Sequence, residues 1–270
     1  MIKKSFSLAT SIIALAFTII PESFFDNFLL FPSFTKEINI IINRSVTCVA
    51  IFALSLLLVG LYLACRWKIK IKGHNYIISV EYGNILKKKK CKKVISFDEC
   101  FTTNVGDRPY EIKANSLCGQ YLRMNPIENI DALIKSAGLK PIGKKTEFKN
   151  KNCYQSGRIV PNGKDLLLAF AKLDNEGLGV FSSKDEFLQS LKVFWQEIEK
   201  YYGQEDVCIP VLGSGKIRFE SGESFNQQEL LDMIISSYKL NSYKIKNPYR
   251  LRIICRRRND FSLGKIGESI

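Results

Sequence analysis

Residues 207–219 decide the fold of this chain, and they read Val207-Cys208-Ile209-Pro210-Val211-Leu212-Gly213-Ser214-Gly215-Lys216-Ile217-Arg218-Phe219. The apolar residues at the start predict a short buried strand, which runs directly into a turn with a glycine on each side of a serine. Glycine lets the backbone approach a ligand closely and aim successive N–H groups at one point. Such a turn suits a phosphate or diphosphate, although an ordinary tight turn can have the same sequence.

The nearest competing motif is the phosphate loop of nucleoside triphosphatases, and the sequence excludes it. That loop has the pattern G-x-x-x-x-G-K-[ST], in which the last hydroxyl binds magnesium. Here Ile217 follows Lys216, and Pro210 occupies the place of the first glycine. We therefore do not expect an ATPase.

Composition indicates a membrane-associated protein with one medium-sized domain. The chain has 270 residues, of which 46% are hydrophobic, and its net charge is +14. Such a charge is typical of proteins that bind nucleic acid or an anionic membrane surface. Much of it lies in residues 66–72 and 87–93, close behind an apolar stretch, with a further basic cluster at 250–258. Because no nucleic-acid-binding motif is present, we expect membrane lipids and no nucleic acid as partners.

The first quarter of the chain predicts two transmembrane helices. Residues 38–65 are apolar and long enough to cross a hydrocarbon core of about 30 Å. Residues of about 6–30 predict a first span; the alternative is a signal peptide, but no small-residue cleavage pattern follows. Arg44, near the outer end of the second span, either reaches to the interface or has a functional role.

Charge predicts the orientation of these spans. Lysines precede the first span, basic residues follow the second, and the loop between them is mostly acidic. Both termini are therefore expected in the cytoplasm. The predicted organisation is two helices with a short extracytoplasmic loop in residues 1–66, and a cytoplasmic domain in residues 67–270.

From Gly73 onward the pattern predicts alternating strands and helices. The expected strands are 77–82, 94–97, 166–171, one starting at Val207, and 251–255. The expected helices are 115–122, 127–137, one capped by Ser183-x-x-Glu186 that ends at Gly203, and one capped by Ser224-x-x-Gln227. This order predicts an α/β domain of three layers, with helices on both faces of the sheet. Ligands bind beyond the carboxyl ends of strands in such sheets, which is where the turn at 213–215 falls.

The cysteines and the single histidine limit the possible chemistry. The eight cysteines contain no C-x-x-C pair, so neither a disulfide framework nor a zinc site is expected. His74 is the only histidine and lies close to the predicted membrane segment. We therefore expect no Ser-His-Asp or Cys-His catalysis, no catalytic residue and no metal ligand.

Together these pieces resemble a macro domain, the α/β/α module that binds ADP-ribose, over residues 72–258. Tyr82-Gly83-Asn84-Ile85 resembles the family's Gly-Asp-Ile turn, in which the acid meets adenine; here Asn84 replaces that acid. Residues 208–217 are similar to the family's second phosphate loop. Ser116-Leu117-Cys118-Gly119-Gln120 lies where the family has its first, glycine-rich loop, but it holds one glycine only.

More narrowly, the chain resembles the membrane-anchored macro-domain effectors of Thoeris anti-phage defence. The similarity is carried by residues 94–103, 115–121 and 157–160, and by two spans followed by this domain. The resemblance implies a receptor for an ADP-ribose-derived signal made by a TIR-domain enzyme, with no other cofactor. Given its two predicted spans, we expect a multi-pass protein of the bacterial cell membrane. Because two helices cannot enclose a water path alone, we also expect a homo-oligomer. Signal binding would then disrupt the membrane and arrest or kill the infected cell.

The same resemblance implies a ligand site. The diphosphate would be held by backbone N–H groups near Gly213, Ser214, Gly215 and Ile217, and Lys216 or Arg218 would add charge. Adenine would face Asn84 and Ile85, and the distal ribose would lie near Asp98 and Glu99. The first loop would be formed by Ser116, Leu117, Gly119 and Gln120. Asp98 and Glu99 are equally suited to end a strand or cap a helix. Two alternative functions remain open: an ADP-ribosyl hydrolase with Asp98 as its acid, and a passive adaptor on the membrane surface.

Overall fold

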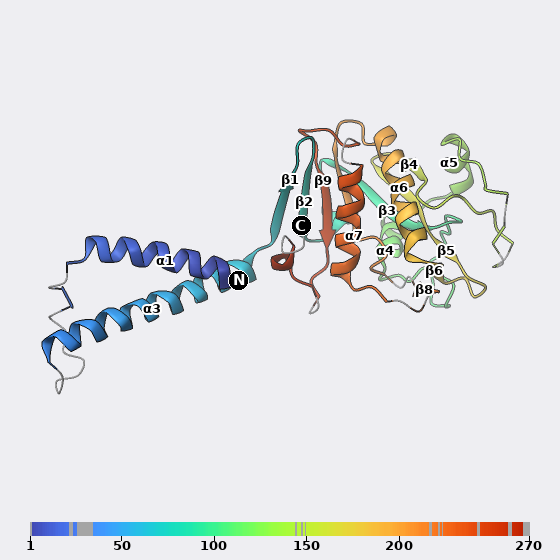
Figure 1. Cartoon of the computed structure of the whole chain (residues 1–270). Helices are drawn as coiled ribbons and strands as arrows, with labels where there is room; N and C mark the ends of the chain where they lie inside the picture. Colours follow the sequence, from blue (N-terminus) through green and yellow to red (C-terminus); the bar gives the residue numbers. More distant parts are fainter. Residues whose placement is uncertain are drawn as a thin grey trace. The chain divides into compact units, whose positions relative to one another are not determined.

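The computed structural model of the chain describes residues 2–21, 24–25, 35–143, 145–146, 148, 150–215, 218–220, 222, 224–241, 244–258 and 261–266. The chain divides into two compact units, Met1–Arg66 and Trp67–Ile270. The first unit contains two long helices, and the second is a mixed α/β domain (Figure 1).

The described part of the first unit includes two long helices, α1 (Ile2–Ile19) and α3 (Lys36–Cys65), which pack against each other. Within the described residues, α3 is the one helix that is long and apolar enough to cross a membrane, while the apolar part of α1, Phe6–Ile19, is shorter. The expected first span of about 6–30 is therefore not one continuous helix, because α1 ends just before Pro21. Residues 22–23 and 26–34 lie outside the described part of the chain.

Arg44 contacts aromatic rings inside this unit. Its guanidinium lies 5.3 Å from the ring centre of Phe17 and 5.9 Å from that of Phe25. The neighbouring Asn43 donates a hydrogen bond of 2.9 Å to the Phe25 carbonyl. Cation–π contacts of this kind hold a charge against an apolar surface, so Arg44 links the two helical segments of the unit.

The second unit contains one mixed sheet, in which the strands lie in the order β1-β2-β9-β7-β3-β5-β6-β8 and β4 pairs with β5. The strands are β1 (Lys68–Lys72), β2 (Ile77–Tyr82), β3 (Cys91–Asp98), β4 (Ile159–Asn162), β5 (Asp165–Leu173), β6 (Gly179–Phe181), β7 (Asp206–Pro210), β8 (Arg218–Phe219) and β9 (Leu251–Cys255). The neighbours β2, β9, β7, β3 and β5 all run parallel, so their carboxyl ends meet at one edge. All the strands expected from the sequence are present.

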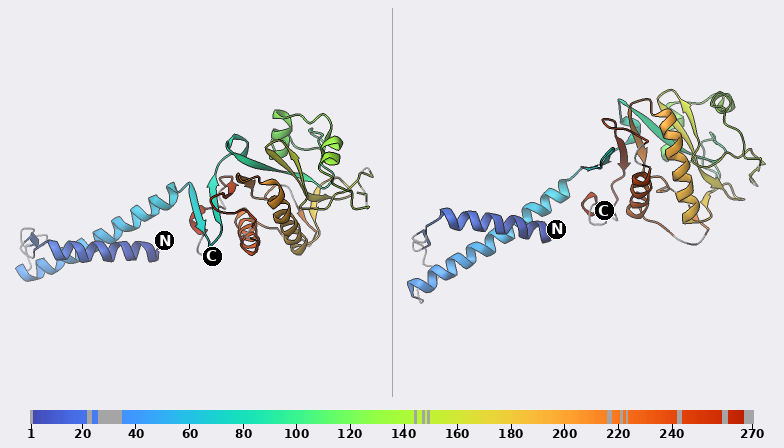
Figure 2. Two further views of the ribbon diagram at one scale, coloured as in Figure 1. Left: turned by 90° about the horizontal axis from the view of Figure 1, so that it is seen from above. Right: turned by 45° about the horizontal axis from the view of Figure 1, so that its top comes forward.

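Helices cover both faces of this sheet, as Figure 2 shows. One face packs against α6 (Lys184–Tyr201) and α7 (Gln227–Leu240), and the other against α4 (Leu117–Met124) and α5 (Ile130–Ser136). Alternate strand residues explain this arrangement, because Val94 and Leu166 belong to the first core while Ile95 and Leu167 belong to the second. The three-layer expectation therefore agrees with the packing, and the antiparallel outer strands make the sheet mixed.

The caps of α6 and α7 test two sequence predictions. Ser183 does cap α6, since its hydroxyl accepts a hydrogen bond of 3.2 Å from the Glu186 amide. The prediction that Ser224 caps α7 is wrong. Asn226 is the cap: its side-chain oxygen accepts from the Glu229 amide at 3.0 Å, and the Glu229 carboxylate accepts from the Asn226 amide at 2.9 Å. Both positions offer short polar side chains with an acid or amide three residues later, and the sequence alone does not distinguish them.

Candidate functional site

The glycine-flanked turn follows β7 at the edge where the parallel strands end. It is closed by Ser214, whose amide and hydroxyl both donate to the Val211 carbonyl, at 3.2 and 2.6 Å. Gly213 has φ +81°, and a Cβ there would lie 3.1 Å from the Phe187 ring. This position therefore requires glycine for its backbone conformation and for its packing.

Gly215 differs from Gly213, because it is exposed and a Cβ there would meet nothing within 4 Å. The backbone at Gly215 is thus open to a ligand from outside. The predicted contacts at Lys216 and Ile217 lie outside the described residues, and Arg218, which follows them, is exposed at the start of β8.

A hollow of about 340 Å³ opens at this turn, and we call it hollow 1. It is lined by the turn, by Arg218 and Phe225, and by Arg258. The Arg258 guanidinium donates to the Ser214 carbonyl at 2.9 Å. The buried amide of Gln227 donates to the Arg256 carbonyl at 2.9 Å and so holds the segment that follows β9. Two guanidinium groups therefore border a turn with an open backbone, which is an arrangement suited to an anion.

A second hollow of about 560 Å³, hollow 2, adjoins the first. Arg218 lines both, and Val180 of hollow 2 is paired with Arg218 between β6 and β8. The walls of hollow 2 include Glu99, Cys153 and Lys172. The two hollows lie within the size range of ligand pockets, roughly 300–1,000 Å³, and together follow the strand ends from β7 to β5.

Asp98 and Glu99, predicted together, have different surroundings. The Asp98 carboxylate accepts hydrogen bonds from the amides of Cys100 (2.8 Å) and Thr102 (3.1 Å), so it closes the turn at the end of β3. The Glu99 carboxylate is buried, accepts from the Leu173 amide at 3.1 Å and lines hollow 2. Burial raises the pKa of both carboxyl groups above their ordinary values. Of the two, Glu99 is the one that faces a hollow.

The Asn84 turn follows β2 on the other side of the phosphate turn. Asn84 is exposed, and its side-chain oxygen accepts from the Leu86 amide at 2.9 Å, which caps a short 3-10 helix, η1 (Ile85–Lys87). The Ile85 side chain is buried against Cys91 and Cys208. The Ile85 side chain is therefore not available to adenine, and the groups left for the predicted contact are the Ile85 backbone and the side-chain amide of Asn84. Arg257 was expected only as one member of the basic cluster at 250–258, and its guanidinium lies 5.1 Å from the ring centre of Tyr82.

The predicted first loop at 116–120 has a local structural role. Ser116 caps α4 by accepting from the Gly119 amide at 3.0 Å, and Gln120 donates to the Asn115 carbonyl at 2.8 Å. A Cβ at Gly119 would lie 2.3 Å from the Lys113 carbonyl oxygen, so glycine is needed for close packing. Leu117 packs beside the Ile85 cluster. These five residues are all described, and none of them lines hollow 1 or hollow 2.

Comparisons with known proteins found both solved structures and sequence relatives. The solved structures that resemble the domain include a mutant of the Oceanobacillus iheyensis macrodomain (10% identity, TM-score 0.47, covering 73% of this chain and 93% of that one). They also include the macrodomain of Thermus aquaticus DarG (15% identity, TM-score 0.38, covering 66% and 97%). These similarities are too low to support an argument about function.

The sequence comparisons are more specific. Thoeris protein ThsA of Bacillus amyloliquefaciens (strain Y2) is 28% identical over 186 residues, which are 66% of this chain and 61% of that protein. The chain thus matches less than two thirds of that relative's length. A family model described as "Thoeris protein ThsA, Macro domain" matches residues 78–256, from β2 to the basic segment after β9. Because this match covers more than half of the chain, the chain belongs to the family of Thoeris ThsA macro domains.

Proposed function

We propose that the domain of residues 67–270 is a receptor for an ADP-ribose-derived signal in Thoeris defence. The observation that carries this proposal is hollow 1, which the open backbone at Gly215 lines together with Arg218 and Arg258, at the edge where the parallel strands end. Membership of the ThsA macro-domain family supports the choice of ligand.

The sheet order sets how such a ligand would lie. The turn after β7 is central, with β9 and β2 on one side and β3 and β5 on the other. With the diphosphate at Gly213–Gly215, one end of the ligand would reach Asn84 and Arg257, and the other would reach Glu99 in hollow 2. We assign adenine to the first end and the distal ribose to the second. Charge-assisted hydrogen bonds from Arg218 and Arg258 would hold the diphosphate.

We favour binding over hydrolysis. Asp98 was the acid required by the hydrolase hypothesis, and one of its carboxylate oxygens already accepts two backbone hydrogen bonds. Glu99, whose pKa is raised by burial and which faces hollow 2, is the group that could serve a hydrolase instead. The position of Glu99 in hollow 2 is the one specific observation that favours the hydrolase.

Titration calorimetry of the full-length protein in detergent with ADP-ribose tests the proposal. We expect one site per chain, and affinity about 10- to 100-fold lower in Arg258→Ala, which loses a charged hydrogen-bond donor worth about 1.5–3 kcal/mol. O-acetyl-ADP-ribose incubated with the protein should be recovered intact. Steady release of acetate that stops in Glu99→Gln would establish the hydrolase, and an absence of any binding of ADP-ribose or of TIR-enzyme products would refute the receptor.

We propose further that α3, together with α1, anchors the protein in the bacterial cell membrane with both termini in the cytoplasm, and that signal binding disrupts this membrane. The length of α3, the basic residues after it and the exposed Trp67 support an anchor. Several chains would be needed, since two helices enclose no water path. Ligand binding must then favour one of two states of the assembly.

Dye leakage from liposomes carrying the full-length protein tests this second proposal. Leakage should begin when the products of a TIR-domain enzyme are added, and it should be missing in the Gly215→Glu variant under the same conditions. Equal leakage with and without those products would show that the membrane is not the target of the signal.

A further inference from the structure

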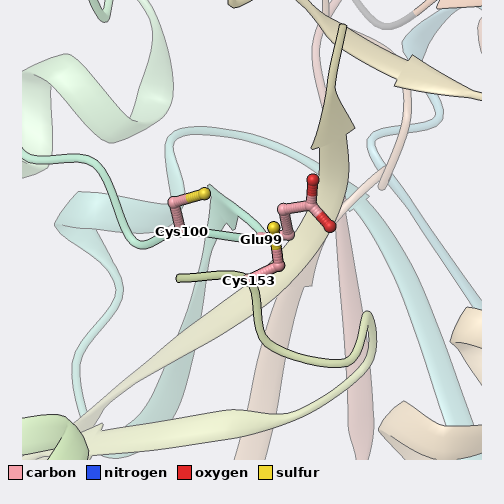
Figure 3. A group of neighbouring side chains, drawn as sticks. All are labelled: Glu99, Cys100 and Cys153. Carbon is pink, nitrogen blue, oxygen red and sulfur yellow. The ribbon is translucent and has the colours of Figure 1, made fainter. Parts of the chain in front are cut away.

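Three side chains with metal-binding atoms meet beside hollow 2: Glu99, Cys100 and Cys153. A carboxylate oxygen of Glu99 and the two Sγ atoms all lie within 4.8 Å of one another. Figure 3 shows that they come from two segments, the turn after β3 and the loop that carries Cys153. Glu99 and Cys153 line hollow 2 itself.

Hydrogen bonds hold the two segments and the Glu99 carboxylate in place. The Tyr154 amide donates to the Glu99 carbonyl at 2.9 Å, directly between the two halves of the cluster. Lys151 donates to the Thr102 hydroxyl at 3.2 Å, and the Leu173 amide fixes one oxygen of Glu99 at 3.1 Å. The three donor groups are therefore positioned by the fold, as a metal site requires.

The turn that carries Glu99 and Cys100 is itself unusual. Asp98 accepts from the Cys100 and Thr102 amides on either side of Phe101, which has φ +51°. A non-glycine residue with positive φ is uncommon, and it persists only where the surroundings enforce it. Here the enforced turn brings Cys100 Sγ back toward Cys153 and places Glu99 on the same cluster. Asp98 thus acts as a positioning residue for the cluster.

We propose that Glu99, Cys100 and Cys153 form a binding site for a thiophilic divalent cation, of which Zn²⁺ is the best match. Two thiolates and one carboxylate are a ligand set that zinc accepts, whereas calcium and magnesium prefer oxygen ligands alone. In a tetrahedral site the zinc–sulfur distance is about 2.3 Å, so the two sulfurs lie about 3.8 Å apart. The side chains need to close by about 1 Å from the 4.8 Å limit to reach this geometry.

A fourth coordination position would lie beside hollow 2, because Glu99 and Cys153 line that hollow. Three protein ligands and one open position are the arrangement found in zinc sites that bind water or a ligand atom. Two thiolates and one carboxylate carry one more negative charge than the ion can balance. Lys172, which also forms an ion pair with Glu186, lies in the wall of the same hollow. A donor atom of a molecule bound in hollow 2 could therefore complete the tetrahedron.

Cobalt(II) binding to the full-length protein in detergent, reduced and stripped of metal, tests the site. We expect one Co²⁺ per chain with thiolate-to-cobalt charge-transfer bands and the d–d bands of a tetrahedral ion, displaced by Zn²⁺. Zinc affinity, measured by competition with a chelator, should fall at least about 100-fold in Cys100→Ser and in Cys153→Ser. Loss of a group that only supports a metal ligand typically lowers affinity about 10- to 100-fold.

Matched variants separate this site from the other thiols and acids. Cys118→Ser removes a buried thiol of α4 outside the cluster, and Glu176→Gln removes an exposed charge from the wall of hollow 2; both should bind zinc like the unchanged protein. Glu99→Gln can still accept from the Leu173 amide, so it should fold and yet bind zinc more weakly. The proposal is overturned if the unchanged protein gives no thiolate–cobalt band, or if Cys100→Ser, Cys153→Ser and Glu99→Gln keep its zinc affinity.

Discussion

Replacing Gly215 by glutamate should lower the affinity for ADP-ribose at least about 100-fold while the domain stays folded. The fold should tolerate the change, because Gly215 is exposed and a Cβ there would meet nothing within 4 Å. The new carboxylate would lie at the turn that we propose holds the diphosphate, in the hollow that Arg218 and Arg258 also line. Like charges brought together in an interface cost several kcal/mol, and about 2.8 kcal/mol already corresponds to 100-fold. Calorimetry with ADP-ribose measures the loss.

Three further variants show whether charge at this position is the cause. Gly215→Ala adds only a methyl group in open space and should bind almost normally. Gly215→Gln has the size of glutamate without its charge, so it should fall between the two. Ser136→Glu adds the same charge on α5, whose residues line neither hollow among those described, and should leave binding unchanged. Normal affinity in a folded Gly215→Glu variant would show that the diphosphate does not bind at this turn.

Gly213 would be a poor choice for the same experiment. Its φ of +81° and the 3.1 Å approach to the Phe187 ring mean that any side chain disturbs the turn and the core below it. The two glycines look alike in the sequence. Their roles differ because one is directed into the core formed with α6 and the other into solvent.

The sequence predicted the parallel core of the sheet well, for a physical reason. Strands such as Leu166–Ala171 are buried on both faces and therefore have continuous apolar runs, while α6 has a clear helical period behind a serine cap. The turn after Val207 was also predicted, since glycine marks both chain reversal and close approach. These features depend on residues close together in the chain.

The parts that were missed depend on contacts between distant residues. Arg258 was visible only as one member of a basic cluster, and it reaches Ser214 because β7 and β9 pair in parallel. The Glu99–Cys100–Cys153 cluster shows no metal-ligand spacing in the sequence, because Cys153 is far along the chain from Glu99 and Cys100. A hydrogen bond from the Tyr154 amide to the Glu99 carbonyl brings the two segments together in the fold. Neither arrangement leaves a periodic or local pattern in the sequence.

Short polar residues are where the predicted ligand contacts coincide with local backbone hydrogen bonds. Asn84, Asp98 and Ser116 were each expected to meet the ligand, and each uses a side-chain oxygen to accept a nearby backbone N–H. Asn, Asp and Ser commonly form such local bonds where strands end and helices begin. Ligand-binding loops occupy the same places, so residue type and position alone do not separate the two roles.

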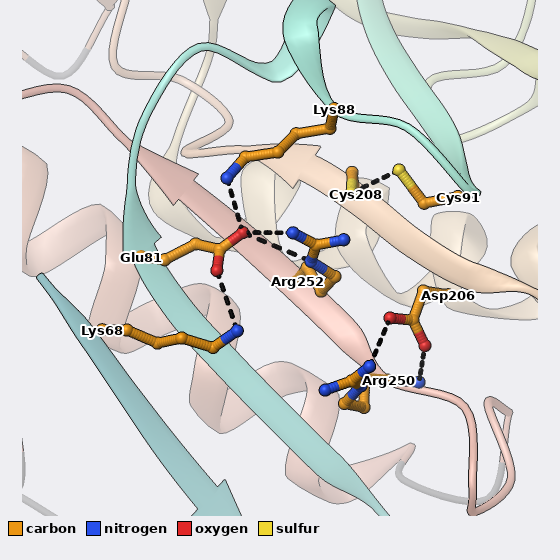
Figure 4. Close-up of polar contacts among 8 residues, drawn as sticks. All are labelled: Lys68, Glu81, Lys88, Cys91, Asp206, Cys208, Arg250 and Arg252. Atoms are coloured by element: carbon orange, nitrogen blue, oxygen red, sulfur yellow. Dashed lines mark hydrogen bonds and ion pairs between the residues drawn. The ribbon is translucent and has the colours of Figure 1, made fainter.

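Figure 4 shows a different polar feature, a buried carboxylate surrounded by three cations at the β1–β2–β9 side of the sheet. Glu81 has 1% of its side chain exposed. It accepts from Arg252 at 2.6 Å and Lys88 at 2.9 Å through one oxygen, and from Lys68 at 3.1 Å through the other. Burial alone would raise the pKa of Glu81, but the hydrogen bonds from Lys88, Arg252 and Lys68 outweigh it and lower the pKa from 4.5 to about 2.

Glu81→Gln should therefore lower the free energy of unfolding at pH 7 by about 3 kcal/mol, because it leaves three cations around a neutral amide. The shift of the Glu81 pKa corresponds to a similar value, about 3 kcal/mol. Glu205→Gln is the matched control: Glu205 pairs with Lys164, whose side chain is 68% exposed, so its loss should cost less than about 1 kcal/mol. Urea unfolding of the full-length protein, followed by the fluorescence of the buried Trp195, measures both.

The pH dependence gives the most discriminating test of this network. Because the folded-state pKa of Glu81 lies below its unfolded value, the carboxylate stabilises the fold above about pH 4.5, and this stabilisation is lost as the pH falls toward 2. The difference in unfolding free energy between the unchanged protein and Glu81→Gln should thus be constant from pH 7 to about 5 and shrink below that. Other carboxyl groups titrate equally in both proteins, so the difference isolates Glu81. A difference below about 1 kcal/mol at pH 7 would mean that solvent and not Glu81 compensates the three cations. A difference that persists undiminished at pH 3 would mean that the loss of stability does not come from the ionised Glu81 carboxylate.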